Sequence, residues 1–210
     1  MEQKTTDQTL NTLPKQGGGL RIAVYCASST KIHEDYVEAA RAIGRELARR
    51  GIGLINGAGK MGLMAAASDA CLAGSGEVTG VIPTFMIEQD WHHKGLTHLI
   101  ETCDMHERKQ TIARLSDGCI ALPGGCGTLE ELMEVITWKQ LGLYLKPIVI
   151  LNIRGYYDHL LAQLQHGIDE HFMGPRHAEI WRVATTAEEA IDLVLSTPLW
   201  DASVRKFAAI

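Results

Sequence analysis

The sequence has few of the features that mark secreted, metal-binding or membrane proteins. Its five cysteines are odd in number and include no C-x-x-C pair, which argues against a disulfide framework or a structural zinc site. The histidines show no H-E-x-x-H spacing, so we expect no catalytic metal. No apolar stretch approaches the roughly 20 residues of a membrane helix, and the first apolar run lacks the flanks of a secretory signal. These absences predict a soluble, cytoplasmic protein without a metal or a membrane partner.

A surplus of positive charge is absent as well. The formal net charge is -5, and the 20 basic residues are interleaved with 25 acidic ones. Because binding to a nucleic acid polymer requires a strong positive field, we expect no such partner. What is present is a chain of 210 residues, 46% of them hydrophobic, which is the size and apolar content of one globular domain.

Two regions differ in composition. Met1–Gly19 is rich in Thr, Gln, Lys and Gly without apolar periodicity, which predicts a disordered N-terminal tail. From residue 20 to residue 210, short β-type runs alternate with helical patterns, which predicts a single Rossmann-like α/β domain with a doubly wound parallel sheet and helices on both faces. Thr84–Gly95 is too irregular to predict a helix. The predicted strands are Leu20–Tyr25, Ile52–Asn56, Glu77–Ile82, His98–Glu101, Cys119–Leu122, Ile148–Leu151 and Ile180–Val183, and the predicted helices are Glu34–Arg50, Leu63–Ala73, Met105–Leu115, Leu129–Leu141, Gly155–Glu170 and Ala187–Leu195.

The most informative segment is Leu122–Glu131, which reads LPGGCGTLEE and lies where a strand ends and a helix begins. Ligands of open α/β sheets bind at that edge. Three glycines in four positions expose backbone N–H groups, and the helix adds its partial positive end, so we expect an anion such as phosphate to bind here, with Thr128 as a helix cap. The alternative is that Thr128-x-x-Glu131 is only a capping box and the glycines only a tight turn.

A second glycine loop, Gly57–Gly62, matches the dinucleotide fingerprint G-x-G-x-x-G. The NAD interpretation also needs an acidic residue at the end of the next strand, to bind the ribose. That strand ends Val81-Ile82-Pro83, and its only acid, Glu77, stands at its beginning. An NAD-dependent oxidoreductase therefore stays open only as a further alternative, and we expect no cofactor.

Two adjacent cations, Arg108 and Lys109, open a predicted helix, whereas the helix macrodipole favours cations at the opposite end. This placement suggests an anionic ligand. Arg108 can bind phosphate or ribose oxygens with its bidentate fork, and Lys109 can add a point charge. The alternative is a solvated helix face paired with Glu107 or Asp104.

Other candidates carry less chemistry. Cys126 lies inside the first glycine loop, where a helix N-terminus could activate a thiol, but no histidine base or orienting acid can be identified for it. Four large side chains at helical or loop positions are interpreted as ordinary packing groups: Met61, Met64, Trp138 and Tyr144.

Two of these motifs together closely resemble those of the LONELY GUY family, whose members were once described as lysine decarboxylases. The first is M-x-x-R-K at residues 105–109, and the second is P-G-G-x-G-T-x-x-E at residues 123–131. Further matches are V-Y-C-x-S-S at residues 24–29, G-x-G-x-x-G-L-M at 57–64, G-V-I-P at 80–83, E-V-I-T-W at 134–138 and G-Y-Y at 155–157. The resemblance covers nearly everything from Arg21 to about Val194.

The resemblance implies a homodimer that releases a free base and ribose 5-phosphate from a nucleoside 5'-monophosphate, typically a cytokinin riboside 5'-monophosphate and in some members AMP. It does not imply amino-acid decarboxylation, because a lysine in the context that pyridoxal phosphate needs is not evident. Carried over by position, the catalytic pair is Arg108 and Glu131. The expected substrate contacts are Lys109, Gly124, Gly125, Cys126, Gly127, Thr128, Glu130, Thr137, Gly57, Gly59, Ser28 and Asp90.

The sequence also departs from the family pattern. Ala27 and Ala58 stand where glycine is usual, and Asp90 stands where a glutamate is often found. These departures leave the base specificity open, and the adjacent Glu130 and Glu131 leave the identity of the catalytic acid open. A nucleotide-binding or sensing module that does not cleave its ligand is the alternative function.

Overall fold

The computed structural model describes residues 19–201 and 203, so all but the last residue of the predicted tail Met1–Gly19 lies outside the described residues. Seven strands form one parallel sheet in the order β4-β3-β2-β1-β5-β6-β7. The predicted doubly wound α/β fold is therefore confirmed. The strands are β1 (Arg21–Tyr25), β2 (Gly53–Asn56), β3 (Val78–Pro83), β4 (His98–Thr102), β5 (Gly118–Ala121), β6 (Ile148–Leu151) and β7 (Arg182–Ala184).

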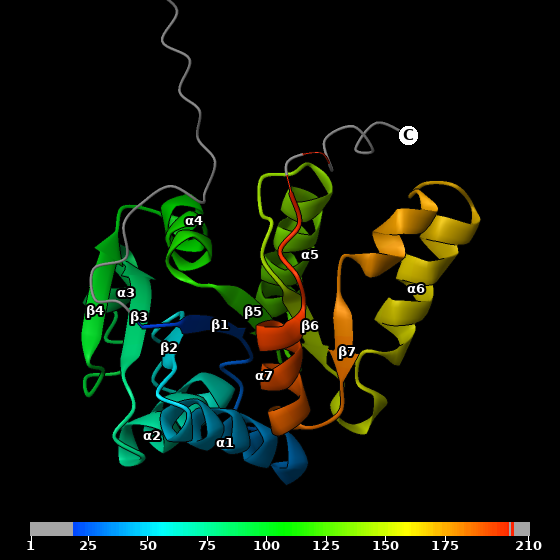
Figure 1. Ribbon diagram of the computed structural model, residues 1–210. Helices are drawn as coiled ribbons and strands as arrows, with labels where there is room; N and C mark the ends of the chain where they lie inside the picture. The colour runs from blue at the N-terminus through cyan, green and yellow to red at the C-terminus, as the bar shows by residue number, and fades with distance from the viewer. Residues whose placement is uncertain (1–18, 202, 204–210) are drawn as a thin grey trace, which may run out of the picture.

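Helices cover both faces of the sheet. In Figure 1, α1, α2 and α7 lie on one side of the sheet, and α4, α5 and α6 lie on the other. None of the described helices is long and apolar enough to cross a bilayer. The α-helices are α1 (Glu34–Arg49), α2 (Gly62–Ala73), α3 (Thr84–Glu88), α4 (Met105–Leu115), α5 (Cys126–Gln140), α6 (Asp158–Asp169) and α7 (Ala187–Ser196).

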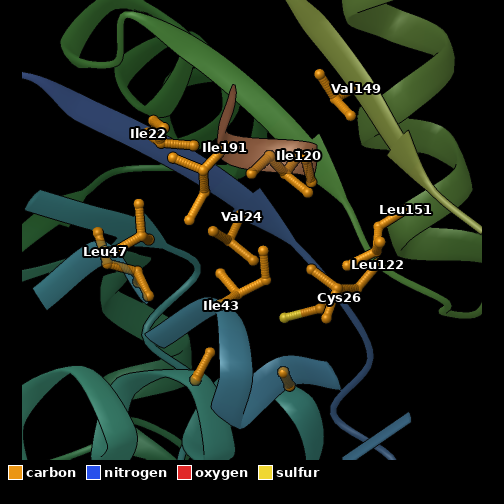
Figure 2. Close-up of a cluster of buried hydrophobic side chains, with 14 of the residues drawn as sticks. Ile22, Val24, Cys26, Ile43, Leu47, Ile120, Leu122, Val149, Leu151 and Ile191 are labelled. Atoms are coloured by element: carbon orange, nitrogen blue, oxygen red, sulfur yellow. The ribbon is translucent and has the colours of Figure 1, made fainter. Parts of the chain in front are cut away.

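The apolar core is divided by the sheet, because successive side chains of a strand point to opposite faces. On one face, Ile22 and Val24 of β1 pack with Ile43 and Leu47 of α1, as Figure 2 shows. On the other face, β1 contributes residues to a second cluster with α4, α5 and α6. Each fully buried aliphatic side chain contributes about 1.5–3 kcal/mol, so the two clusters hold the strand ends in fixed positions.

Helix α5 begins earlier than predicted, at Cys126 instead of Leu129. Gly125 is its N-cap residue and Thr128 lies inside the first turn, so the predicted Thr128 cap and the capping box with Glu131 are wrong. The reason is local packing. A Cβ atom on Gly124 would lie 2.1 Å from the Thr128 hydroxyl oxygen, so the buried threonine packs directly over this glycine, and the helical first turn holds it there.

The segment Thr84–Gly95 contains the short helix α3, which its sequence did not predict, and is irregular beyond it. The irregular part is bound to the loop between β2 and α2. The Lys60 N–H donates to the Trp91 carbonyl over 3.0 Å, and the His93 N–H donates to the Ala58 carbonyl over 2.8 Å. This segment therefore forms a wall beside the loop after β2.

The helix predicted over Gly155–Glu170 begins later than predicted, at Asp158. Arg154 and Gly155 have φ angles of 56° and 68°, in the left-handed region that interrupts a helix. A 3-10 turn over Ile153–Gly155 precedes α6 instead. The bend places two adjacent tyrosines, at positions 156 and 157, beside the loop between β5 and α5.

Candidate functional site

A cleft opens at the carboxyl edge of the sheet, between β1 and β5. These two strands are neighbours in the sheet, and the strands that follow β1 in sequence lie on one side of them while those that follow β5 lie on the other. This switch point is where open α/β sheets bind ligands. The cavity has a volume of about 630 Å³, within the range of roughly 300–1,000 Å³ that is usual for small-molecule sites. Nine of the predicted site residues line it: Ser28, Gly57, Gly59, Arg108, Gly125, Gly127, Thr128, Glu130 and Glu131.

The loop between β5 and α5 presents an open helix N-terminus to this cleft. Its N-cap residue, Gly125, makes no side-chain capping bond. The first N–H groups of a helix have no partner within the helix, and the macrodipole adds partial positive charge there. A Cβ atom built on Gly125 or Gly127 would meet no atom within 4 Å, so the backbone faces free space. This geometry suits an anionic group such as phosphate.

The loop between β2 and α2 does not present a free helix N-terminus. The N–H groups of Leu63 and Met64 both donate to the Ala27 carbonyl, over 2.9 and 3.3 Å. Its glycines make room for side chains instead: a Cβ atom on Gly57 would lie 1.7 Å from Nη2 of Arg108, and one on Gly59 would lie 2.8 Å from Cε of Met64. The G-x-G-x-x-G match therefore does not supply a pyrophosphate site here.

Arg108 is fixed between three elements. Its Nε donates to the Val81 carbonyl over 3.0 Å, its Nη2 donates to the Gly57 carbonyl over 3.2 Å, and its Nη1 lies 3.4 Å from Oε1 of Glu131. The residue is only 7% exposed, so the predicted alternative of a solvated helix face is wrong. Because protein carbonyls bind two guanidinium nitrogens, Arg108 is a fixed cation beside Glu131 with little of its fork left for a ligand.

Glu131 is the buried member of the acidic pair. Burial raises the pKa of its carboxyl to about 7, although the nearby Arg108 guanidinium opposes this shift. The Glu131 side chain is 11% exposed, whereas that of Glu130 is 56% exposed. A carboxyl that titrates near neutral pH inside a cleft is suited to acid–base chemistry. The difference in burial favours Glu131 over Glu130 as the catalytic acid, a choice that the sequence alone left open.

Lys109 lies behind the acidic residues and does not line the cleft. Its Nζ forms ion pairs with Glu130 and, at 3.2 Å, with Glu134 of α5. Burial opposes the Lys109 charge, but these two carboxylates together raise its pKa above the usual value. Lys109 is thus a buried cation that joins α4 to α5.

Four other predicted site residues lie outside the cleft lining. Gly124 is covered by Thr128, and Cys126 is exposed at the start of α5. None of the described residues that line the cleft is a histidine that could activate this thiol. Thr137 donates its hydroxyl to the Met133 carbonyl over 2.8 Å on the exposed side of α5. Asp90 pairs with Lys60, which does line the cleft, and with Lys94, at 2.8 and 2.9 Å.

Sequence reasoning missed an apolar wall of the cleft. Met61, Met64, Met86, Met105 and Trp91 all line it, and Met61 is 50% exposed. The interpretation of Met61 as an ordinary packing group is therefore wrong, whereas Met64 both packs against the first core cluster and lines the cleft. The other two predicted packing groups are confirmed, since Tyr144 is fully buried and Trp138 packs against the second core cluster. Thioethers and an indole ring form a surface suited to a planar aromatic group.

Residues 64–194 match the sequence model of the family described as "Possible lysine decarboxylase". The chain is also 41% identical, over 191 residues, to a cytokinin riboside 5'-monophosphate phosphoribohydrolase of Arabidopsis thaliana, covering 86% of this chain and 88% of that protein. A second phosphoribohydrolase of this name from the same plant is 43% identical over 171 residues, covering 81% of this chain and 80% of that protein. The chain belongs to the LONELY GUY family.

For this LONELY GUY protein, the resemblance predicted from the motifs at residues 105–109 and 123–131 is confirmed. Solved structures extend the likeness at the level of the fold. A molybdenum cofactor binding protein from Rippkaea orientalis superposes with a TM-score of 0.66 and 22% identity, covering 85% of this chain and 96% of that one. Identity this low bears on the fold alone.

Proposed function

We propose that this chain hydrolyses the N-glycosidic bond of a nucleoside 5'-monophosphate, either a cytokinin riboside 5'-monophosphate or AMP, to a free base and ribose 5-phosphate. One observation carries the proposal: the Arg108–Glu131 pair shares a cleft with the uncapped N-terminus of α5. The names of the A. thaliana relatives support this substrate class.

The 5'-phosphate binds at the β5–α5 loop. Backbone N–H groups between Gly125 and Thr128 donate to its oxygens, and the helix end adds partial positive charge. Gly124 and Cys126 contribute through the backbone of the same loop. This arrangement accounts for an anionic substrate without a metal or a cofactor.

The sugar lies against Glu131. When the bond between C1' and the base nitrogen breaks, its electron pair leaves with the base, and positive charge develops at C1' and the ring oxygen. The Glu131 carboxylate stabilises that charge and accepts a proton from the water that attacks C1'. The departing base takes up a proton, so that one water molecule is consumed for each nucleotide cleaved.

Arg108 acts by charge and position. A guanidinium is too basic to donate a proton readily, and three of the five Arg108 N–H donors are bound to Val81, Gly57 and Glu131. It therefore keeps the Glu131 carboxyl oriented and favours its ionised form. Lys109 supports this arrangement from outside the cleft, because its ion pairs with Glu130 and Glu134 hold α5 against α4.

The base lies against the wall of methionines and Trp91. Lys60 stands at this end of the cleft, with Asp90 holding its ammonium group by an ion pair. Through this pairing Asp90 contributes to substrate binding at the rim.

The protein acts in the cytoplasm as a homodimer of one nucleotide-binding domain, residues 20–210. Thr137 and the 44% exposed Leu141 lie on the outer side of α5, away from the cleft of their own chain. A second copy packed on this side would cover both residues. Sedimentation at micromolar concentration should give twice the mass of the chain, and a monomer would contradict the dimer without affecting the chemistry.

The test of the activity is direct. Purified protein is incubated with AMP and with prenylated AMP, and the free base and ribose 5-phosphate are quantified by chromatography. Glu131→Gln should abolish release, whereas Glu130→Gln, at the exposed neighbour, should retain most of it. If the wild-type protein releases no base from any nucleotide yet binds it tightly, the proposal is wrong and a sensing module is favoured.

A further inference from the structure

We infer that Tyr156 is a positioning residue that aims a backbone donor of the phosphate loop into the cleft. The residue is part of the G-Y-Y match at positions 155–157, and, unlike the buried Tyr157, it is explained neither by the reaction nor by the core. The inference rests on the proposed function for the identity of the ligand.

Two adjacent tyrosines bind the β5–α5 loop from the side of α6. The Tyr156 hydroxyl donates to the Gly124 carbonyl over 2.6 Å, and the Tyr157 hydroxyl donates to the Leu122 carbonyl over 2.6 Å. The Tyr156 ring is itself fixed by edge contacts with Tyr157 and Tyr36, at centroid distances of 5.1 and 5.9 Å. The hydroxyl that contacts Gly124 is therefore presented by a rigid side chain.

The bond to Gly124 determines where the next N–H points. A trans peptide unit is planar, so its C=O and N–H groups point in opposite directions, and no cis peptide is found in the described part of the chain. Fixing the Gly124 carbonyl toward Tyr156 therefore turns the Gly125 N–H away from it. Gly125 lines the cleft, and no acceptor among the described residues pairs with its N–H. With glycine on both sides, this peptide would otherwise rotate easily.

The bond from Tyr157 differs in kind. The Leu122 carbonyl belongs to the peptide unit of Pro123, which has no N–H to aim. Tyr157 is also 1% exposed, whereas Tyr156 is 42% exposed. Removing the Tyr157 hydroxyl thus leaves a buried carbonyl unpaired and lowers stability without redirecting a donor. Tyr157 is therefore a matched control, because its hydroxyl binds the same β5–α5 loop.

The experiment compares Tyr156→Phe and Tyr157→Phe with the wild-type protein. Because phosphate lies away from the bond that breaks, Tyr156→Phe should raise KM for AMP about tenfold and leave kcat within about twofold. The inhibition constant of ribose 5-phosphate should rise by a similar factor, and that of free adenine should not change. Tyr157→Phe should lower the melting temperature and leave both inhibition constants near the wild-type values.

Backbone NMR gives a second readout. The Gly125 amide resonance should shift on addition of ribose 5-phosphate in the wild-type protein and shift less in Tyr156→Phe. Unchanged ribose 5-phosphate affinity in Tyr156→Phe, or an equal loss in Tyr157→Phe, would overturn the inference while leaving the proposed hydrolysis intact. Binding of AMP and ribose 5-phosphate without turnover would overturn the hydrolysis but not the role of Tyr156. A wild-type protein that binds neither compound would contradict both.

Discussion

Two glycine-rich loops, each between a strand and a helix, serve opposite purposes in this protein. At the β2–α2 loop, the Leu63 and Met64 N–H groups in the first turn of α2 donate to the Ala27 carbonyl, and the space beside Gly57 is filled by Arg108. At the β5–α5 loop, the helix N-terminus is uncapped, and Gly125 and Gly127 face open space. Glycine in a sequence therefore indicates that space is needed next to the backbone. Whether a side chain or a ligand fills it depends on the neighbouring loops.

The largest expected effect tests whether the chemistry takes place at the β5–α5 side of the cleft. Glu131→Gln should lower kcat by about 10³-fold, because the variant can neither ionise nor accept a proton. In the wild-type protein, kcat/KM should rise with pH through about 7, as the Glu131 carboxyl with its raised pKa loses its proton. Steady-state assays from pH 5 to 9 check both. Glu130→Gln is the control, and a larger loss in that variant would exchange the roles of the two acids.

The β2–α2 loop can be disturbed through its contact with Arg108. Gly57→Ala places a methyl group 1.7 Å from the present position of Nη2, so the guanidinium must move. Displacement of about 1 Å in a catalytic group can cost about 10²-fold in rate, and we expect a loss of that size in kcat/KM. Crystallography or the pH profile of the variant should show Arg108 moved from Glu131. Full activity in Gly57→Ala would mean that the position of Arg108 is not critical.

The buried Glu131 carboxyl of α5 should also lower the stability of the folded protein. Between pH 4.5 and about 7 the unfolded Glu131 ionises while the folded one stays protonated, so the free energy of unfolding falls as pH rises through this window. The amide of Glu131→Gln avoids this loss. The variant and the wild type should be similar in stability at pH 4, and the variant should be more stable by up to about 3 kcal/mol at pH 8. Urea unfolding at both pH values measures the difference, and equal curves at pH 8 would contradict it.

A methyl group at the open loop should affect binding alone. Gly125 has a φ of -82° and no atom within 4 Å of a Cβ position, so Gly125→Ala should change the free energy of unfolding by less than about 0.5 kcal/mol. KM for the nucleotide should nevertheless rise about tenfold, because the methyl group occupies space proposed for phosphate. An unchanged KM would indicate that the phosphate lies elsewhere.

The last prediction is that a dinucleotide has no effect, because the β2–α2 loop does not bind it. NADH at millimolar concentration should neither change its fluorescence on mixing with the protein nor inhibit base release, because the N-terminus of α2 has no free N–H groups at Leu63 and Met64. Measurable dinucleotide binding that is lost in a variant of the β2–α2 loop would reverse the assignment of the two loops.

The alternating pattern of the sequence was enough to predict the sheet, since each buried strand and its following helix are local features. It was also enough to place both glycine loops at the same edge. The burial of Arg108 and Lys109 could not be predicted, because their surroundings are carboxylates and carbonyls from α5, β3 and the loop after β2, which are remote in sequence. The exposure of Met61 could not be predicted either, because a methionine beside an apolar stretch fits a core and a cleft wall equally well.

The Ala27 carbonyl has a consequence for how this scaffold could diverge. It belongs to the loop after β1, not to α2, so a change of length in that loop would withdraw it and leave Leu63 and Met64 with unsatisfied donors. A helix end in that condition attracts anions. One short insertion or deletion in that loop, remote in sequence from both glycine motifs, would thus create a second phosphate pocket on the β2–α2 side of the same cleft.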